Sequence, residues 1–175
     1  MALPREYVRQ NCSAARALEI VGERWTLLIV RDAFFGIRRF SDFSRHLDIP
    51  RAVLTERLAF LVDEGVLDRE PGAGRRFGYV LSAKGRALWP VVRSLVEWGD
   101  AYCAPDGPRR LFEHADCGGP VGPGERCGHC GRTVPVEDTV MVPGPGFASP
   151  GTRGADDALA VALSRPRRLL TPIGG

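Results

Sequence analysis

In the N-terminal half of the chain, apolar residues recur mainly at the three- and four-residue spacing of α-helices. Leu54, Leu58 and Leu61 follow one another at i, i+4 and i+7, which predicts an amphipathic helix over residues 51–64 that ends at Gly65. Three earlier helices are expected over residues 14–21 (capped by Ser13), 24–35, and 42–47 (capped by Ser41).

Two short segments, residues 66–70 and 77–81, have the composition of β-strands. The turn-rich residues 71–76 between them predict a hairpin with two arginines at its tip. Ser82 is then expected to cap a long helix over residues 83–103. Because this helix carries more apolar surface than a solvent-facing helix normally shows, a partner subunit is its simplest cover.

The order of these elements predicts a mainly α protein with a small β-hairpin, which is the α+β winged helix-turn-helix fold. A short helix, a brief turn and a second amphipathic helix form the helix-turn-helix unit, and the hairpin after it is the wing. In this arrangement the second helix enters the DNA major groove, and the wing lies along the backbone or the minor groove. The fold class therefore predicts double-stranded DNA as a partner.

The outward face of the helix over residues 51–64 holds the candidate base contacts. A rotation of about 100° per residue turns Ala52, Thr55 and Glu56 away from the leucines, and Arg51 projects from the helix start. These side chain types suit guanine, cytosine and thymine edges. Candidate phosphate contacts lie before this helix or on the wing: Arg38, Arg39, Ser41, Arg45, Arg75, Arg76 and Lys84. A single arginine is equally well explained as a solvated surface charge, and Glu56 is better explained as the intrahelical partner of a nearby arginine than as a base contact.

Composition changes this picture only slightly. The chain has 44% hydrophobic and 26% charged residues, as globular proteins do, and its formal charge of +3 is weak evidence for a polyanion partner. Lys84 is the only lysine, so the other basic side chains are mostly guanidinium groups suited to phosphate and guanine, although a GC-rich genome explains the same bias. No signal or membrane segment is visible and the cysteines are odd in number, which together favour a cytoplasmic protein.

Turn-forming residues become frequent near residue 104. Ten of the 14 prolines and 13 of the 21 glycines occur from Pro105 onward. We expect a DNA-binding and dimerisation domain over residues 1–104, a Cys/His-rich appendage over 105–142, and a Pro/Gly linker with a flexible tail over 143–175, in which residues 156–164 suit a short helix.

Four potential metal ligands form two close pairs within the appendage, His114 with Cys117 and Cys127 with Cys130. Two short chelating loops suit tetrahedral zinc, and four protein ligands indicate a structural rather than a catalytic ion. His129 is a less suitable substitute for His114 because it lies between two ligands. Two alternatives remain, a loop with unligated thiols and a redox dithiol formed by Cys127 and Cys130.

Several blocks carry a family resemblance: CSAARALEIVGERWTLLIVRD from Cys12, FFGIRRFSDF from Phe34, RAVLTERL from Arg51, and LSAKGRAL from Leu81. Over about residues 10–103 the chain resembles HxlR-type winged helix-turn-helix regulators. The resemblance implies a homodimeric bacterial DNA-binding regulator, usually a repressor, that pairs through its first and last helices. The chain departs from the family in having Ser13 where members often have proline, and in its short wing.

The resemblance also draws attention to Cys12, since in some members a cysteine at this position responds to oxidants or electrophiles. A helix N-terminus and the nearby Arg9 and Arg16 would stabilise its thiolate, while the alternative is an inert cysteine at the dimer contact.

No catalytic motif is present, so the sequence predicts a non-enzymatic regulator on a pseudo-palindromic operator. Its inducer, a small molecule or an oxidant, is not specified by any motif. Two alternatives stay open: a zinc- or thiol-dependent enzyme or redox protein that uses Cys127 and Cys130 on a helical dimer scaffold, and an adaptor whose zinc module docks another protein.

Overall fold

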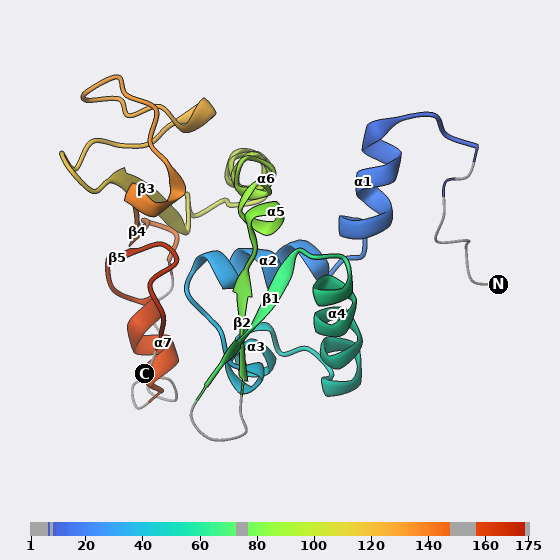
Figure 1. Ribbon diagram of the computed structural model, residues 1–175. Coiled ribbons are helices and arrows are strands. Elements are labelled where there is room, and N and C mark those ends of the chain that lie inside the picture. Colours follow the sequence, from blue (N-terminus) through green and yellow to red (C-terminus); the bar gives the residue numbers. More distant parts are fainter. Residues whose placement is uncertain (1–6, 8, 73–76, 148–156, 174–175) are drawn as a thin grey trace.

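The computed structural model describes residues 7, 9–72, 77–147 and 157–173. Its first part, residues 13–102, is called the body here and begins with four helices: α1 (Ser13–Val21), α2 (Thr26–Phe34), α3 (Phe40–Leu47) and α4 (Arg51–Asp63). Leu54, Leu58 and Leu61 are fully buried, as their spacing predicts. The apolar α2 lies at the centre of the body in Figure 1, as expected for a helix with apolar residues nearly all round.

Two predicted helix caps are wrong by one or two residues. Ser13 and Ser41 lie inside α1 and α3, and the extended residues before these helices are Cys12 and Arg39. α3 starts early because Phe40 packs against the core from the first turn, and the Ser41 hydroxyl donates to the carboxylate of Asp42 instead of capping.

The wing is an antiparallel hairpin of β1 (Leu67–Pro71) and β2 (Phe77–Leu81), in which Leu67 pairs with Leu81. Ser82 caps the next helix as expected, since its Oγ accepts a hydrogen bond from Gly85 N–H at 3.0 Å.

The long helix expected over residues 83–103 is instead two helices, α5 (Ala83–Arg86) and α6 (Trp89–Tyr102). Pro90 explains the break, because it has no N–H to donate to the carbonyl of Arg86 and its ring clashes with that carbonyl in a continuous helix. Pro90 is tolerated in the first turn of α6, where the N–H has no partner in the helix.

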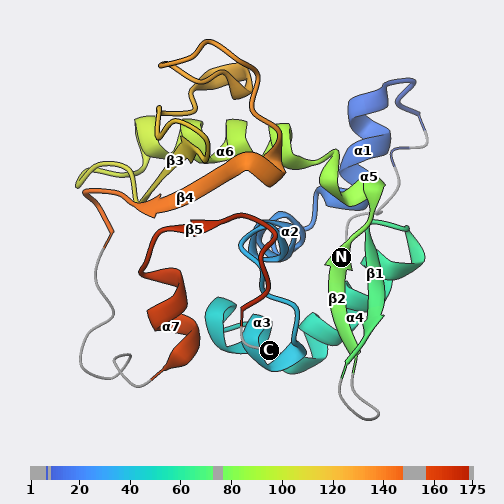
Figure 2. The ribbon, with the colours of Figure 1, turned by 60° about the vertical axis from the view of Figure 1, so that its left-hand side comes forward.

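The C-terminal module, residues 110–147 and 157–173, contains a three-stranded antiparallel sheet in the order β3-β4-β5. Its elements are β3 (Arg110–His114), the 3₁₀ turns η1 (Pro123–Glu125) and η2 (Val136–Asp138), β4 (Thr139–Pro143), the short helix α7 (Ala158–Leu163), and β5 (Arg167–Arg168). Figure 2 shows the sheet between α6 and α7.

One hydrophobic core runs through the body and the module. The ring of Trp89 in α6 lies 4.9 Å from that of Phe34 in α2 and 5.5 Å from that of Phe112 in β3. The core is therefore continuous across the boundary expected near residue 104.

The tail differs from the expectation of a flexible segment, because its described residues 157–173 pack on the body. Leu159 and Leu163 of α7 are buried, which agrees with the short helix expected there. Leu170 N–H donates to the carbonyl of Phe34 at 2.7 Å, and Ile173 N–H donates to that of Gly36 at 3.0 Å. The Phe34 carbonyl ends α2 and has no partner within the helix, the Gly36 carbonyl lies two residues beyond it, and the tail supplies donors to both.

Within the part of the chain that the structure describes, no helix is long and apolar enough to cross a membrane.

Candidate nucleic-acid interface and metal centre

The exposed side of α4 carries the predicted base contacts. Arg51, Ala52, Thr55 and Glu56 are all exposed, and they face away from the buried leucines. The Thr55 hydroxyl donates to the carbonyl of Arg51 at 2.8 Å, and the Arg51 guanidinium lies 5.3 Å from the centre of the Phe40 ring. Figure 1 shows the hairpin of β1 and β2 extending to the same side of the molecule as the N-terminal end of α4.

Glu56 forms an ion pair with the neighbouring Arg57, whose side chain is largely buried. This pairing is the alternative that the sequence favoured for Glu56. It makes Glu56 a weaker candidate for a base contact than Arg51.

The candidate phosphate contacts near α3 differ in their ion pairs. Arg39 and Ser41 are exposed at the start of α3. Arg38 pairs with Glu70 on β1, so its charge is already compensated. Arg45 pairs with Asp157 at 2.9 Å and thus joins α3 to the residue that caps α7.

Lys84 lies away from the base-contacting end of α4. Its ammonium donates to the carbonyl of Glu64 at 2.6 Å, directly after the C-terminal end of α4. It therefore neutralises the negative end of that helix, and its position argues against the expected role at the wing. Arg75 and Arg76 lie outside the described residues.

Arg69 on β1 is an exposed basic residue that sequence reasoning missed. Its guanidinium lies 4.8 Å from the centre of the Phe77 ring on β2. The signal was available, since an arginine and an aromatic residue near the same end of a hairpin are able to stack across the strands.

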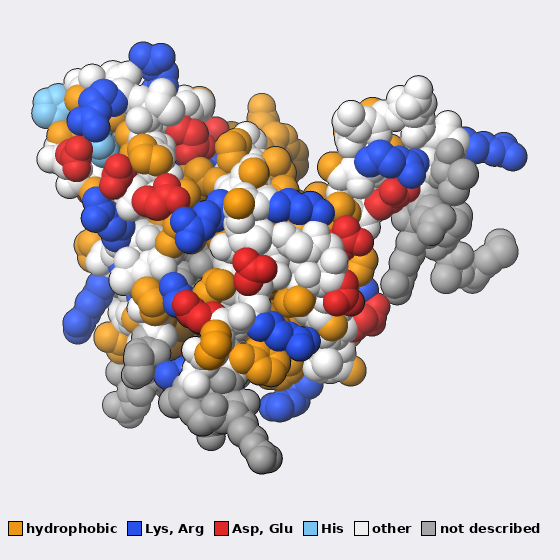
Figure 3. Space-filling view, in the orientation of Figure 1, with side chains coloured by type: hydrophobic (Ala, Val, Ile, Leu, Met, Phe, Trp, Pro, Cys, Tyr) orange, Lys and Arg blue, Asp and Glu red, His pale blue; other side chains and the backbone are white. Residues whose placement is uncertain are grey.

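Charge is mixed over the visible surface. Figure 3 shows basic and acidic side chains interspersed, with hydrophobic side chains gathered over α6. The mixture agrees with the small net charge of +3. It favours a DNA contact limited to α4, the start of α3 and the wing over binding by a broad basic face.

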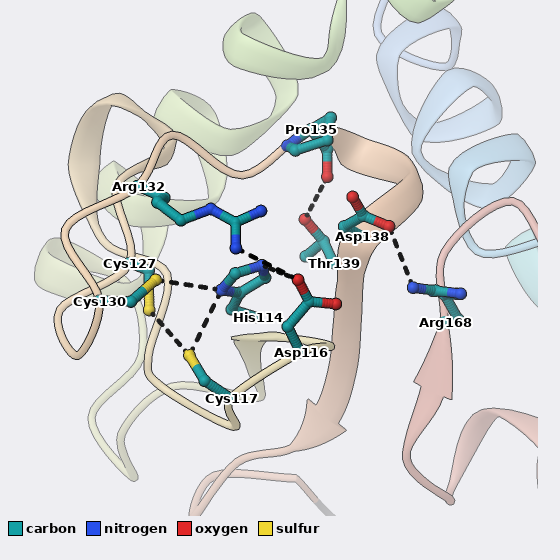
Figure 4. Close-up of polar contacts among 10 residues, drawn as sticks. All are labelled: His114, Asp116, Cys117, Cys127, Cys130, Arg132, Pro135, Asp138, Thr139 and Arg168. Atoms are coloured by element: carbon teal, nitrogen blue, oxygen red, sulfur yellow. Dashed lines mark hydrogen bonds and ion pairs between the residues drawn. The ribbon is translucent and has the colours of Figure 1, made fainter.

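The four predicted metal ligands lie together at one end of the C-terminal module (Figure 4). His114 ends β3, Cys117 follows in a tight turn, and Cys127 and Cys130 come from the loop before η2. Their ligand atoms are all within 4.8 Å of one another. The substitute considered from sequence, His129, is not in this group.

The spacing of the ligand atoms suits a tetrahedral ion. Nδ1 of His114 lies 3.3 Å from Sγ of Cys117 and 3.4 Å from Sγ of Cys130, and the sulfurs of Cys117 and Cys127 are 3.5 Å apart. Zinc bonds of about 2.3 Å to sulfur and about 2.0–2.1 Å to nitrogen place tetrahedral ligands about 3.6–3.8 Å apart. The group is thus able to hold a metal ion, with Nδ1 as the histidine ligand.

Surrounding groups support metal binding at this cluster. The backbone N–H of Cys130, and next that of His129, donate toward the sulfur of Cys127 and lower the pKa of its thiol to about 6. Nε2 of His114 faces Asp116 at 3.5 Å, and a carboxylate on the second nitrogen typically orients a ligand histidine. A Cβ on Gly119 would lie 2.6 Å from the Cys127 sulfur, so only glycine fits there.

Cys12 is exposed and immediately precedes α1. The backbone N–H groups of Ala15 and Ala14, in the first turn of α1, lower the pKa of the Cys12 thiol. The direction is the one expected at a helix N-terminus.

Comparisons with known proteins agree with this architecture. A model of the HxlR-like helix-turn-helix family matches residues 20–107. An uncharacterized HTH-type transcriptional regulator of Mycobacterium tuberculosis is 46% identical over 138 residues, which are 77% of this chain and 87% of the relative. Another from Bacillus subtilis, YvaP, is 36% identical over 93 residues, 51% of this chain and 86% of the relative.

A solved structure extends the likeness to the fold. The crystal structure of PA1607, a candidate transcription factor, aligns with a TM-score of 0.61 at 38% identity. The alignment covers 74% of this chain and 93% of that protein, so it reaches beyond the residues that the family model matches.

Proposed function

Because the chain belongs to the HxlR-like helix-turn-helix family, whose members are DNA-binding transcriptional regulators, we propose that it is a repressor that binds a pseudo-palindromic operator as a homodimer. The exposed face of α4 beside the wing is the observation that carries this proposal. A winged-helix regulator needs no catalytic group, so we propose a non-enzymatic role, and a cytoplasmic location follows from a role on bacterial DNA.

In the proposed complex, the N-terminal half of α4 enters the major groove. Arg51 is suited to the two acceptors on a guanine edge, and Ala52 and Thr55 to a thymine methyl group. Arg39, Ser41, Arg75 and Arg76 contact phosphates, and Arg69 is added to this group because of its exposed place on the wing. Two recognition helices about 34 Å apart then bind successive major grooves.

The homodimer is proposed to form through α6 and α1. Val91, Leu95, Trp98 and Tyr102 make an exposed apolar stripe along α6, with Trp98 58% and Tyr102 75% exposed. Leu18 on α1 is also exposed. A second copy that covers this stripe removes a large apolar surface from water and places two α4 helices on one face of the dimer.

The metal is proposed to be a structural zinc bound by His114, Cys117, Cys127 and Cys130. When bound, zinc would hold the two ligand loops together as a tetrahedral centre. Four protein ligands leave no position for a reacting water, so the centre serves folding.

Cys12 is proposed as an oxidant- or electrophile-responsive thiol. It is exposed and the pKa of its thiol is lowered, which favours the nucleophilic thiolate. Alkylation by iodoacetamide at pH 7 should label Cys12 faster than Cys103, and equal rates would argue against a special reactivity.

DNA titration tests the proposed function. Fluorescence anisotropy with DNA from upstream of the chain's own gene should show tight, salt-dependent binding that scrambled DNA lacks. Arg51→Ala should weaken operator binding by about 1–3 kcal/mol and reduce the preference for operator. Arg76→Ala should weaken binding to both DNAs alike. It should also make the binding constant depend less steeply on salt concentration.

Arg132→Ala, an exposed arginine in the C-terminal module, is the matched control and should leave both affinities unchanged. If Arg51→Ala bound operator as wild type does, the placement of α4 in the groove would be wrong. If folded dimer bound neither DNA, the operator proposal itself would fail.

A further inference from the structure

A cavity of about 370 Å³ lies at the junction of the body and the C-terminal module. Its walls come from α2, α3, α6, β3 and the segment after β4. Figure 2 shows α6 and β3 above α2, with α3 below it. The volume falls within the range of about 300–1,000 Å³ typical of small-molecule sites.

The cavity combines cations with aromatic rings. Arg31, Arg109 and Arg110 line it, against a single lining carboxylate, that of Asp100. Phe35, Phe112 and Phe147 supply ring surface.

The neighbouring buried carboxylate is already neutralised. Asp32 is fully buried, and its Oδ1 accepts from Arg31 at 2.7 Å while its Oδ2 lies 2.6 Å from Nδ1 of His46. Asp32 forms no ion pair with Arg110, and its charge only partly offsets the effects of burial and of Arg31 on Arg110.

Arg110 is the side chain in the cavity that best indicates the charge of a ligand. Its guanidinium donates to the carbonyl of Leu163 at 2.6 Å and lies 4.1 Å from the centre of the Phe147 ring. Among the described residues, no carboxylate forms an ion pair with it. Burial and then the nearby Arg31 lower the pKa of Arg110 to about 10, while Asp32 acts in the opposite direction.

We propose that this cavity binds a small aromatic carboxylate as an effector, with its carboxylate on Arg110 and its ring against Phe147 and Phe35. Guanidinium groups bind carboxylates strongly through paired N–H donors, and rings provide the apolar remainder. The effector role rests on the DNA-binding function proposed above. Because His46 of α3 shares the cavity with α6 and β3, a bound ligand ties the helix-turn-helix unit to the module and thereby changes DNA affinity.

Gly99 offers a way to fill the cavity without disturbing its walls. Val96, Gly99, Asp100 and Cys103 line the cavity along one face of α6, which differs from the exposed stripe that contains Trp98. A Cβ at Gly99 would meet nothing within 4 Å. Gly99→Phe should therefore occupy the ligand's space, while Gly99→Ala leaves it open and serves as the matched control.

The binding test uses the full chain and isothermal titration calorimetry. Phenylacetate should bind wild type and Gly99→Ala alike, and Gly99→Phe should lose binding while keeping its thermal transition. The neutral isostere phenylacetamide should bind at least roughly tenfold more weakly, because it lacks the charge that the arginines stabilise. Arg110→Gln should reduce the preference for phenylacetate over phenylacetamide to near equality. Absence of phenylacetate binding, binding that survives in Gly99→Phe, or equal affinity of wild type for acid and amide would each overturn the site.

The regulatory test repeats the DNA titration with saturating phenylacetate. Operator affinity should change by roughly fivefold or more in wild type and in Gly99→Ala, but not in Gly99→Phe. An unchanged affinity in ligand-bound wild type would refute the effector role. If wild type bound no DNA under either condition, the DNA-binding proposal would fail instead, and calorimetry would still decide the site.

Discussion

The body and the C-terminal module contribute to one hydrophobic core, but they are built from different kinds of secondary structure. In the body, helices with regular apolar faces bury residues such as Phe34, Phe43 and Leu58 among themselves. The module is built on short strands, buries residues such as Val134 and Met141, and packs its Phe112 on Trp89 of the body. Its order thus depends on contact with the core of the body, and the proposed zinc would add a second constraint at the other end of the module.

Contacts of different kinds join the two regions. They include the edge-to-face contact of Trp89 with Phe112, the buried guanidinium of Arg93, the exposed ion pair of Arg86 with Glu137, and the backbone hydrogen bonds from the tail to Phe34 and Gly36. Each responds to a different perturbation, so the dependence of the module on the body can be measured one contact at a time.

Loss of the proposed zinc should have the largest effect, and this effect should be confined to the module. Structural zinc supplies apparent folding free energies of about 10–16 kcal/mol in zinc-finger peptides, whereas the helices of the body do not depend on it. Cys127→Ser should weaken zinc affinity by at least roughly a hundredfold, measured by competition with a chromophoric chelator. Hydrogen exchange should show lost protection in β3 and β4 and retained protection in α4.

Cys103→Ser is the control, because the Cys103 thiol lies outside the cluster, and this variant should bind one zinc per chain as wild type does. Equal zinc affinity of the two variants would refute the centre.

Gly36→Ala should detach the tail from the body. Gly36 has a φ of +90°, and an added Cβ would lie 1.8 Å from the carbonyl oxygen of Thr171. Strain and overlap together should lower the free energy of unfolding by about 2–5 kcal/mol, measured by urea denaturation. Gly65 also has a positive φ but has open space around it, so Gly65→Ala isolates the strain alone, about 1–2 kcal/mol. If Gly36→Ala lowered the free energy of unfolding no more than Gly65→Ala does, the tail would not pack closely against the chain at Gly36.

Arg93→Ala should weaken the junction from within. Arg93 is 6% exposed, donates to the carbonyl of Val121 at 3.1 Å, and lies 4.3 Å from the centre of the Phe112 ring. Loss of these contacts, with the Val121 carbonyl left unpaired, should cost about 2 kcal/mol in thermal or urea unfolding. Faster hydrogen exchange near Val121, without change at the wing, would place the effect at the junction. If Arg93→Ala lowered the free energy of unfolding less than Arg86→Ala does, the proposed contribution of Arg93 to the junction would be contradicted.

Arg86→Ala should have the smallest effect. The Arg86–Glu137 pair also joins the two regions, at 3.0 Å, but both side chains are about half exposed. Exposed ion pairs contribute about 0.2–1 kcal/mol, and salt screens them. The difference from wild type should therefore vanish in 1 M NaCl, and a difference that persists there would indicate a contact other than the ion pair.

Sequence reasoning succeeded where a local pattern determines structure. Leucine spacing located α4 and its exposed face, and ligand spacing located the Cys/His cluster with His114 preferred over His129. Both signals lie within a stretch of fewer than 20 consecutive residues, so they can be seen in the sequence alone. The break at Pro90 was also local, and the apolar content of residues 83–103 outweighed it in the prediction.

Long-range contacts explain what the sequence did not show. The tail was expected to be flexible because its Pro and Gly content is typical of linkers, yet Leu170 finds its hydrogen-bond partner at Phe34. Lys84 was assigned to the wing by proximity in sequence, although it contacts the end of α4. The cavity at the junction is lined from five separate segments, and no single stretch of sequence carries its signal.

The hydrogen bonds from Leu170 and Ile173 to Phe34 and Gly36 also set an order for synthesis. A ribosome that adds about 5–20 residues per second finishes α2 roughly seven to twenty-seven seconds before it adds Leu170. Because the wing ends at Leu81, the helix-turn-helix and the wing are also finished several seconds before residue 170 is added, while the carbonyls of Phe34 and Gly36 still lack these donors. A nascent chain that stops short of residue 170 therefore misses both hydrogen bonds, and its residues 34–36 should open locally more often than in the full chain.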